Sequence, residues 1–127
     1  LFVVSAQDGY GIYFFKPEHG EYGWAGADYG VAGRAFLRAI DYQTGTIKWN
    51  HELGDGASAA GVLTTDSGLA FTGDVPGNAM AVRTSDGVTL WHSAIGRMGN
   101  PPITYLLDGR QYILFGGGSS LVAFALP

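Results

Sequence analysis

Histidine and aspartate are the side chains in this sequence that could ligate a metal ion or move a proton. The three histidines, His19, His51 and His92, share no spacing typical of a metal site. Several aspartates stand beside expected turns or in loops, where a carboxylate accepts hydrogen bonds from backbone N–H groups; these are Asp28, Asp55, Asp66 and Asp74. The sequence therefore predicts surface and turn roles for these residues and no metal site.

Motifs for several other chemistries are absent from the sequence. It contains neither a phosphate-binding P-loop nor a G-x-S-x-G nucleophile motif. It has no cysteine, which excludes disulfides and thiolate metal sites. The 7 basic residues are scattered and the formal charge is −4, which argues against nucleic acid as a partner. No apolar run approaches the ~18 residues that a membrane-spanning helix needs.

The composition indicates a β fold. Glycine accounts for 21 of the 127 residues, which is more than double its usual share of ~7%. Together with many β-branched and aromatic residues, this glycine content predicts short strands joined by tight turns. No stretch keeps a helical period, so we predict an all-β fold, and the length favours a single domain over residues 1–127.

A repeated pattern organises the strands. Residues 39–49 read as a strand, a turn at Gly45 and a second strand ending on tryptophan, and residues 81–91 repeat this order. The alanine, the glycine and the tryptophan each recur after 42 residues, and Ala123 lies another 42 residues on. In a β-rich chain, a period of about 40–45 residues is typical of propeller blades.

Alignment by this period predicts part of a propeller. One complete four-stranded blade is expected over residues 59–92, between an incomplete blade over 1–50 and an incomplete last blade over 101–127. Three blades cannot close a ring of the usual four to eight. Because residue 1 is a leucine inside an expected strand, we expect the chain to be a piece of a longer propeller. Its other blades would lie on the same or on a separate chain, and each end would present an unpaired sheet edge.

Residues 7–33 show no sustained period, and we expect most of them to form a long loop within the first blade. The segment carries three aromatic residues, Tyr22, Trp24 and Tyr29. Two interpretations remain open for them: a substrate-facing lid or partner surface, or a loop that packs its own aromatic side chains against the propeller.

The repeated pattern resembles a known motif. Ala39-x-Asp41-x-x-x-Gly45-x-x-x-Trp49 resembles the tryptophan-docking motif of the quinoprotein dehydrogenases, eight-bladed propellers that use pyrroloquinoline quinone. The second copy departs from the motif at Arg83, where the family usually has aspartate. The resemblance covers residues 34–127 well and residues 1–6 loosely. Further segments that agree with the family are 61–73, 102–105, 108–109, 111–112 and 123–127.

The physical logic of the motif is structural. A flat indole on an outer strand can stack on the peptide plane of a neighbouring turn, where a glycine leaves that plane uncovered, and its N–H can bond a backbone carbonyl. The resemblance therefore implies that the docking residues tie neighbouring blades together; they are Ala39, Asp41, Gly45, Trp49, Ala81, Gly87 and Trp91.

The resemblance also implies a function for the complete protein. It would be a periplasmic enzyme that oxidises an alcohol or a sugar, using pyrroloquinoline quinone with calcium or a lanthanide ion, and an electron acceptor such as a cytochrome or a quinone. In the family the metal ligands and the catalytic aspartate belong to earlier blades, whose motifs do not occur here. No catalytic or metal-binding residue is therefore predicted in this chain, which would supply scaffold and cofactor-pocket wall. The alternative hypothesis is a non-catalytic propeller scaffold that binds proteins.

Four residues are candidates for that wall. Gly116, Gly117 and Gly118 precede the last strand, in a region that the resemblance places near the funnel over the cofactor. They would contact the quinone through their backbone, or else simply form a bulge or a tight connection. Asn78 follows Pro76-Gly77 and would either aim its amide inward or stabilise the turn.

Overall fold

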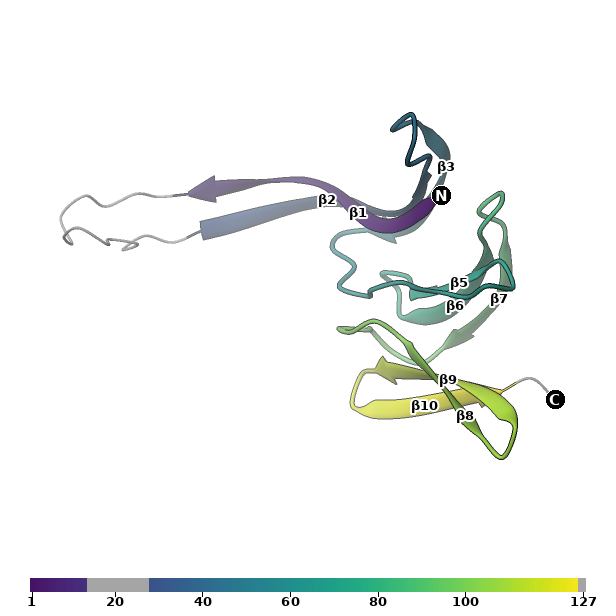
Figure 1. Ribbon diagram of the computed structural model, residues 1–127. Coiled ribbons are helices and arrows are strands. Elements are labelled where there is room, and N and C mark those ends of the chain that lie inside the picture. Colours follow the sequence, from purple (N-terminus) through teal and green to yellow (C-terminus); the bar gives the residue numbers. More distant parts are fainter. Residues whose placement is uncertain (14–27, 126–127) are drawn as a thin grey trace, which may run out of the picture.

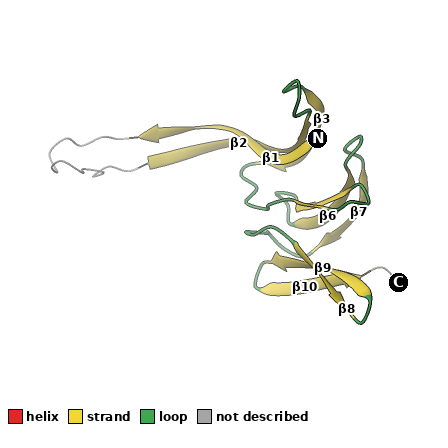
Figure 2. Ribbon diagram, in the orientation of Figure 1, coloured by secondary structure: helices red, strands yellow, loops and turns green. Residues whose placement is uncertain are grey.

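The three-dimensional structure is a computed structural model that describes residues 1–13 and 28–125. These residues form strands joined by turns, and none of them is helical (Figure 2), so the all-β prediction is confirmed. The described part accordingly contains no helix long and apolar enough to cross a membrane. In chain order the strands are β1 (Phe2–Tyr13), β2 (Asp28–Ile40), β3 (Ile47–Asp55), β4 (Leu63–Thr64), β5 (Leu69–Gly73), β6 (Asn78–Arg83), β7 (Thr89–Ala94), β8 (Ile103–Leu107), β9 (Arg110–Gly117) and β10 (Ser120–Ala125).

The strands form three antiparallel sheets that follow one another along the chain (Figure 1). The first sheet has the order β1-β2-β3, the second β4-β5-β6-β7, and the third β10-β9-β8. Four strands in the middle and three on either side are what the 42-residue period predicts.

The repeated pattern has the same register in both copies. Ala39 lies opposite Trp49 across β2 and β3, and Ala81 lies opposite Trp91 across β6 and β7. In each copy the register shifts immediately after the alanine, and such a bulge increases the local twist of the strand pair. The alanine and the tryptophan of the pattern are thus cross-strand neighbours.

The first sheet differs from the sequence-based expectation. The predicted loop over residues 7–33 is wrong at both of its ends, because β1 continues to Tyr13 and β2 begins at Asp28. The two strands pair up to Tyr13 opposite Asp28, and their outer part extends away from the other sheets (Figure 1). Backbone pairing such as that of Gly11 with Gly30 needs no alternation of apolar side chains, so it left no period to detect.

Part of that expectation lies outside the described residues, including Tyr22 and Trp24. Tyr29 is in β2, opposite Ile12 of β1. A lid or partner surface formed by these aromatic residues stays a prediction.

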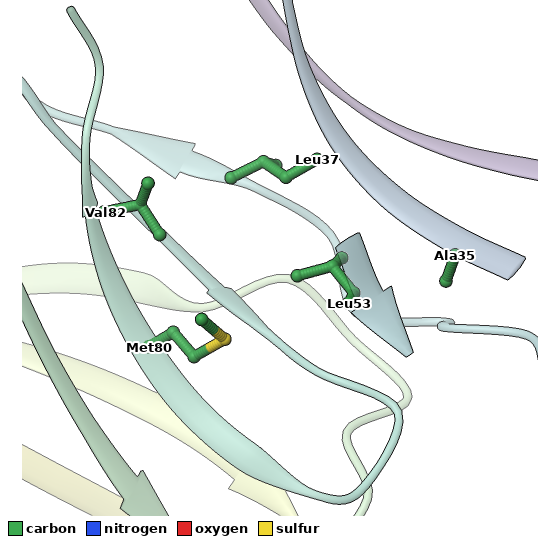
Figure 3. Packing of buried hydrophobic residues seen from close by; sticks show 5 residues of the cluster. All are labelled: Ala35, Leu37, Leu53, Met80 and Val82. Atoms are coloured by element: carbon green, nitrogen blue, oxygen red, sulfur yellow. The ribbon is translucent and has the colours of Figure 1, made fainter. Parts of the chain in front are cut away.

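Two apolar clusters join the sheets. Between the first and second sheets the buried residues are Ala35, Leu37, Leu53, Met80 and Val82, whose side chains converge from both sheets (Figure 3). Between the second and third sheets they are Ala60, Ala79, Met98, Ile113 and Phe115. Leu37, Val82 and Phe115 are fully buried, and each such side chain stabilises the fold by about 1.5–3 kcal/mol. The sheets are therefore held face to face by side chains from strands far apart in the sequence.

Candidate functional site

Trp49 connects the first and second sheets. Its Nε1–H donates a hydrogen bond to the carbonyl oxygen of Thr84 over 2.8 Å. Gly87 adopts a φ of +77°, and a Cβ atom placed on it would lie 2.7 Å from Cε3 of Trp49. The indole therefore lies directly against the turn between β6 and β7, and only glycine suits both the backbone angle and the space.

The first turn of the repeated pattern is stabilised by Asp41. Its Oδ1 accepts hydrogen bonds from the backbone N–H of Gln43 at 2.9 Å and of Thr44 at 3.2 Å. Lys48 Nζ lies 3.3 Å from its Oδ2. The bond from Gln43, followed by those from Lys48 and Thr44, lowers the pKa of Asp41 below its ordinary value of 3.8.

The second turn reaches a similar arrangement with a different residue. Arg83, which stands where the family has aspartate, pairs through Nη1 with Oδ2 of Asp86 over 2.7 Å. The other oxygen of Asp86 accepts a hydrogen bond from the backbone N–H of Val88 at 3.1 Å. A carboxylate three residues later thus stabilises this turn, so the departure at Arg83 leaves it folded.

Trp91 faces the third sheet. Its ring centroid lies 4.7 Å from that of Phe124 and 6.3 Å from that of Phe115. A cavity of about 330 Å³ opens beside it, lined mainly by apolar side chains of the second and third sheets, among them Phe71 and Ile113. Sequence reasoning missed this cavity. The 42-residue period could have indicated it, because Trp91 is the repeat of Trp49. No described turn of the third sheet corresponds to the turn between β6 and β7 that Trp49 contacts.

Asn78 is engaged in the turn between β5 and β6. Its Nδ2 donates a hydrogen bond to Oδ2 of Asp74 over 2.6 Å. Oδ1 of Asp74 accepts from the backbone N–H groups of Gly77 at 2.8 Å and of Asn78 itself at 2.7 Å. Of the two roles considered for Asn78, the structure shows the one in which its amide stabilises its own turn.

The three consecutive glycines lie where β9 turns into β10, and they differ in their surroundings. A Cβ atom on Gly117 would lie 2.5 Å from the carbonyl oxygen of Ile95, whereas one on Gly116 would meet nothing closer than Leu121 Cδ2 at 3.8 Å. Gly118 has a φ of +56° and donates its N–H to the carbonyl oxygen of Arg97 over 3.0 Å. Gly117 and Gly118 thus allow the third sheet to approach the end of β7.

The structure brings Asn78 and these glycines to the same end of the second and third sheets. The carbonyl oxygen of Gly77 accepts hydrogen bonds from the N–H groups of both Ile95 and Gly96 at 3.0 Å. A Cβ atom on Gly96 would in turn lie 3.2 Å from the backbone nitrogen of Gly118. The segment 95–97 therefore connects the two groups of predicted cofactor contacts.

Contact of these residues with pyrroloquinoline quinone stays a prediction. The cavity beside Trp91 includes neither Asn78 nor any of the three glycines. Among the described residues, no group of three or more histidines and carboxylates is placed to hold a metal ion. His51 and His92 lie on different strands, β3 and β7, and His19 is outside the described residues. No chemical step is therefore assigned to this chain.

Comparison with known proteins gives sequence relatives of one kind. No protein-family profile matches the chain. It is 41% identical over 78 residues to a quinoprotein ethanol dehydrogenase of Pseudomonas putida, and 38% identical over 78 residues to one of Pseudomonas aeruginosa. Each match covers 61% of this chain and 12% of the relative. The chain thus spans only about an eighth of the length of these relatives.

Comparison with solved structures also gives proteins of this kind. The chain is similar to a quinohaemoprotein alcohol dehydrogenase of Pseudomonas putida HK5, with a TM-score of 0.72 and 19% identity, over 94% of this chain and 20% of that one. It is also similar to a quinohaemoprotein alcohol dehydrogenase of Comamonas testosteroni, with a TM-score of 0.62 and 27% identity, over 70% of this chain and 13% of that one. These likenesses confirm the prediction of part of a propeller. In sequence and in fold, the chain is related to a segment of the quinoprotein alcohol dehydrogenases.

Proposed function

We propose that this chain is the C-terminal propeller segment of a pyrroloquinoline-quinone-dependent dehydrogenase that oxidises an alcohol or a sugar. The observation that carries the proposal is the 41% identity over 78 residues with a protein named quinoprotein ethanol dehydrogenase. The segment contributes scaffold and pocket wall, and catalysis belongs to other parts of the complete protein. Its three blades, over residues 1–50, 59–92 and 101–127, form one partial propeller domain.

The partners follow from the same relationship. The remaining blades complete the ring, and a small alcohol or sugar is the substrate. Electrons leave to an acceptor such as a cytochrome or a quinone, and the complete protein works in the periplasm. When bound, pyrroloquinoline quinone supplies the oxidant, and calcium or a lanthanide ion is held beside it by residues of other blades.

The wall is formed at the end of the sheets where Asn78 and residues 116–118 meet. Gly116 is partly exposed, and the nearest atom to a Cβ atom placed on it is Leu121 Cδ2 at an ordinary contact distance of 3.8 Å. Its exposed surface is therefore within reach of a neighbouring group. Beside it, Gly117 packs closely against Ile95, and Gly118 donates its N–H to the carbonyl oxygen of Arg97.

The test uses the whole polypeptide that contains these residues. The purified protein is incubated with pyrroloquinoline quinone and calcium, passed through a desalting column, and assayed for retained quinone absorbance and for dye-linked oxidation of ethanol and glucose. We expect stoichiometric quinone and turnover of at least one substrate. A folded whole protein that retains no quinone would overturn the proposal and favour a non-catalytic protein-binding propeller. Turnover by the 127 residues alone would contradict the scaffold role.

A further inference from the structure

The sequence contains four Asp-Gly dipeptides, in which an aspartate side chain can react with its own backbone. They are Asp8-Gly9, Asp55-Gly56, Asp86-Gly87 and Asp108-Gly109. The backbone nitrogen of the glycine attacks the aspartate carboxyl carbon, and the absence of a glycine side chain leaves that approach unhindered. Attack requires a conformer in which the two atoms are about 3–3.5 Å apart. Contacts that hold the carboxylate or the glycine N–H elsewhere therefore slow the reaction.

Both reacting groups of Asp86-Gly87 are held by the fold. The carboxylate accepts a hydrogen bond from Arg83 Nη1 over 2.7 Å and another from the backbone N–H of Val88 at 3.1 Å. The N–H of Gly87 donates to the carbonyl oxygen of Arg83 over 2.9 Å. The reaction at this position therefore requires the turn between β6 and β7 to open.

Two further pairs lie in or beside the first sheet and are also held. In Asp8-Gly9 the carboxylate forms an ion pair with Arg38 over 3.5 Å, and the glycine belongs to the ladder between β1 and β2. In Asp55-Gly56 the glycine N–H donates to the carbonyl oxygen of Gly33 over 2.7 Å. Backbone pairing thus restrains at least one reacting group in each of these pairs.

Asp108-Gly109 lacks such contacts. It forms the two-residue turn between β8 and β9, and both residues are exposed. Within residues 1–13 and 28–125, the carboxylate of Asp108 has no hydrogen-bond or ion-pair partner, and the N–H of Gly109 has no acceptor. Asp108 adopts a φ of +51°, which is uncommon for a residue with a side chain. Strand β8 is exposed along its whole length, so little packing opposes opening of this turn.

We propose that Asp108 is a site of isoaspartate formation in the folded protein. The backbone nitrogen of Gly109 bonds to Cγ of Asp108, and the carboxyl hydroxyl leaves with the amide proton as one water molecule. Water then adds to the main-chain carbonyl carbon of the resulting cyclic imide and breaks its bond to that nitrogen. The chain now continues through Cβ and Cγ of residue 108, and the former main-chain carbonyl is a free carboxylate. One water leaves and one enters, so no oxidant or other co-reactant is consumed.

The product changes the turn in a way that a modifying enzyme can recognise. It adds one carbon atom to the main chain between strands that pair Leu107 with Arg110. Its new carboxylate is the type of group that S-adenosylmethionine-dependent isoaspartyl methyltransferases accept. The inference does not rest on the proposed function, since it needs neither cofactor nor catalysis.

The experiment ages the whole polypeptide that contains these residues at neutral pH in H₂¹⁸O. Isoaspartate is located in its peptides by electron-transfer fragmentation and quantified by methylation with an isoaspartyl methyltransferase, and ¹⁸O marks the residues that reacted during ageing. We expect at least ~5-fold more isoaspartate at Asp108 than at each of the other three positions, because those must also break a hydrogen bond or an ion pair.

Two controls test whether the fold causes this difference. In guanidinium chloride the four pairs should react at similar rates, because the reacting residues are the same in each. In the folded protein, Arg83→Ala should raise isoaspartate at Asp86, whose carboxylate loses a partner, and leave the amount at Asp108 unchanged. No more isoaspartate at Asp108 than at another of these pairs, or the same ratio in the folded and the unfolded protein, would overturn the proposal.

Discussion

The indole of Trp49 covers Gly87, and the two residues come from different sheets. A Cβ atom at Gly87 would lie 2.7 Å from Cε3 and 2.9 Å from Cδ2 of the indole. The same ring donates a hydrogen bond to Thr84, three residues before the glycine. One side chain therefore connects the sheets through both packing and a directional bond, and its effect on stability can be separated into these two parts.

The packing part is tested by Gly87→Ala with Gly45→Ala as its control. The two glycines have nearly the same φ, +77° and +72°, so both substitutions incur the left-handed strain of about 1–2 kcal/mol. Only Gly87 faces the indole, whereas no described atom lies within 4 Å of the Cβ position at Gly45. Gly87→Ala should lower the free energy of unfolding by a further 1–3 kcal/mol or so in urea titrations. Equal losses for the two variants would contradict the contact.

The hydrogen-bonding part is tested by Trp49→Phe beside Trp91→Phe. Each substitution removes one indole N–H and some apolar area, but only Trp49 has an acceptor among the described residues. Loss of that bond should cost Trp49→Phe about 1 kcal/mol more than Trp91→Phe. The measurement is equilibrium unfolding in urea of the two variants. A loss for Trp91→Phe at least as large as that for Trp49→Phe would contradict the expected contribution of the bond.

Asp41 should make the turn at residues 41–45 sensitive to acid. Because the folded chain lowers the pKa of this carboxyl below 3.8, chiefly through the N–H of Gln43, its ionised form is favoured by folding. The contribution is complete above the unfolded pKa and is lost as pH falls through the lower folded pKa. Urea titrations over the range from pH 7 into the acid region should show a smaller acid-induced loss for Asp41→Asn than for the parent chain. An identical pH profile would show that Asp41 does not contribute.

Gly117 and Gly116 should respond very differently to alanine. Gly117→Ala places a Cβ atom 2.5 Å from the Ile95 carbonyl oxygen, so backbone must move, and we expect a loss of about 2–4 kcal/mol in the free energy of unfolding. Gly116→Ala makes only an ordinary contact with Leu121 and should cost about 1 kcal/mol or less. Urea titrations of both variants measure the difference.

Gly116→Ala also tests the proposed wall separately from stability. In the whole protein it should reduce retained pyrroloquinoline quinone while the unfolding midpoint stays close to that of the parent. Gly99→Ala is a control, because no described atom lies within 4 Å of the Cβ position of Gly99. Unchanged quinone retention by Gly116→Ala would remove Gly116 from the cofactor pocket.

Among the predicted site residues, those that act locally could be inferred from the sequence alone. Gly45 and Gly87 do adopt the positive φ that their turns require, and turn chemistry depends on a few adjacent residues. The surroundings of Asn78 could not be inferred in the same way. Its amide had two candidate directions, and only the folded turn directs it to Asp74.

The sequence by itself determined the all-β class and the 42-residue period, because both depend on the types and spacing of residues along the chain. Tertiary structure alone decided the pairing of β1 with β2 beyond residue 7, the contact of Gly117 with Ile95, and the cavity beside Trp91. Glycine-rich strands pair through backbone groups that all residues share. Packing between the sheets depends on contacts between segments that lie tens of residues apart in the sequence. No local sequence pattern specifies such contacts.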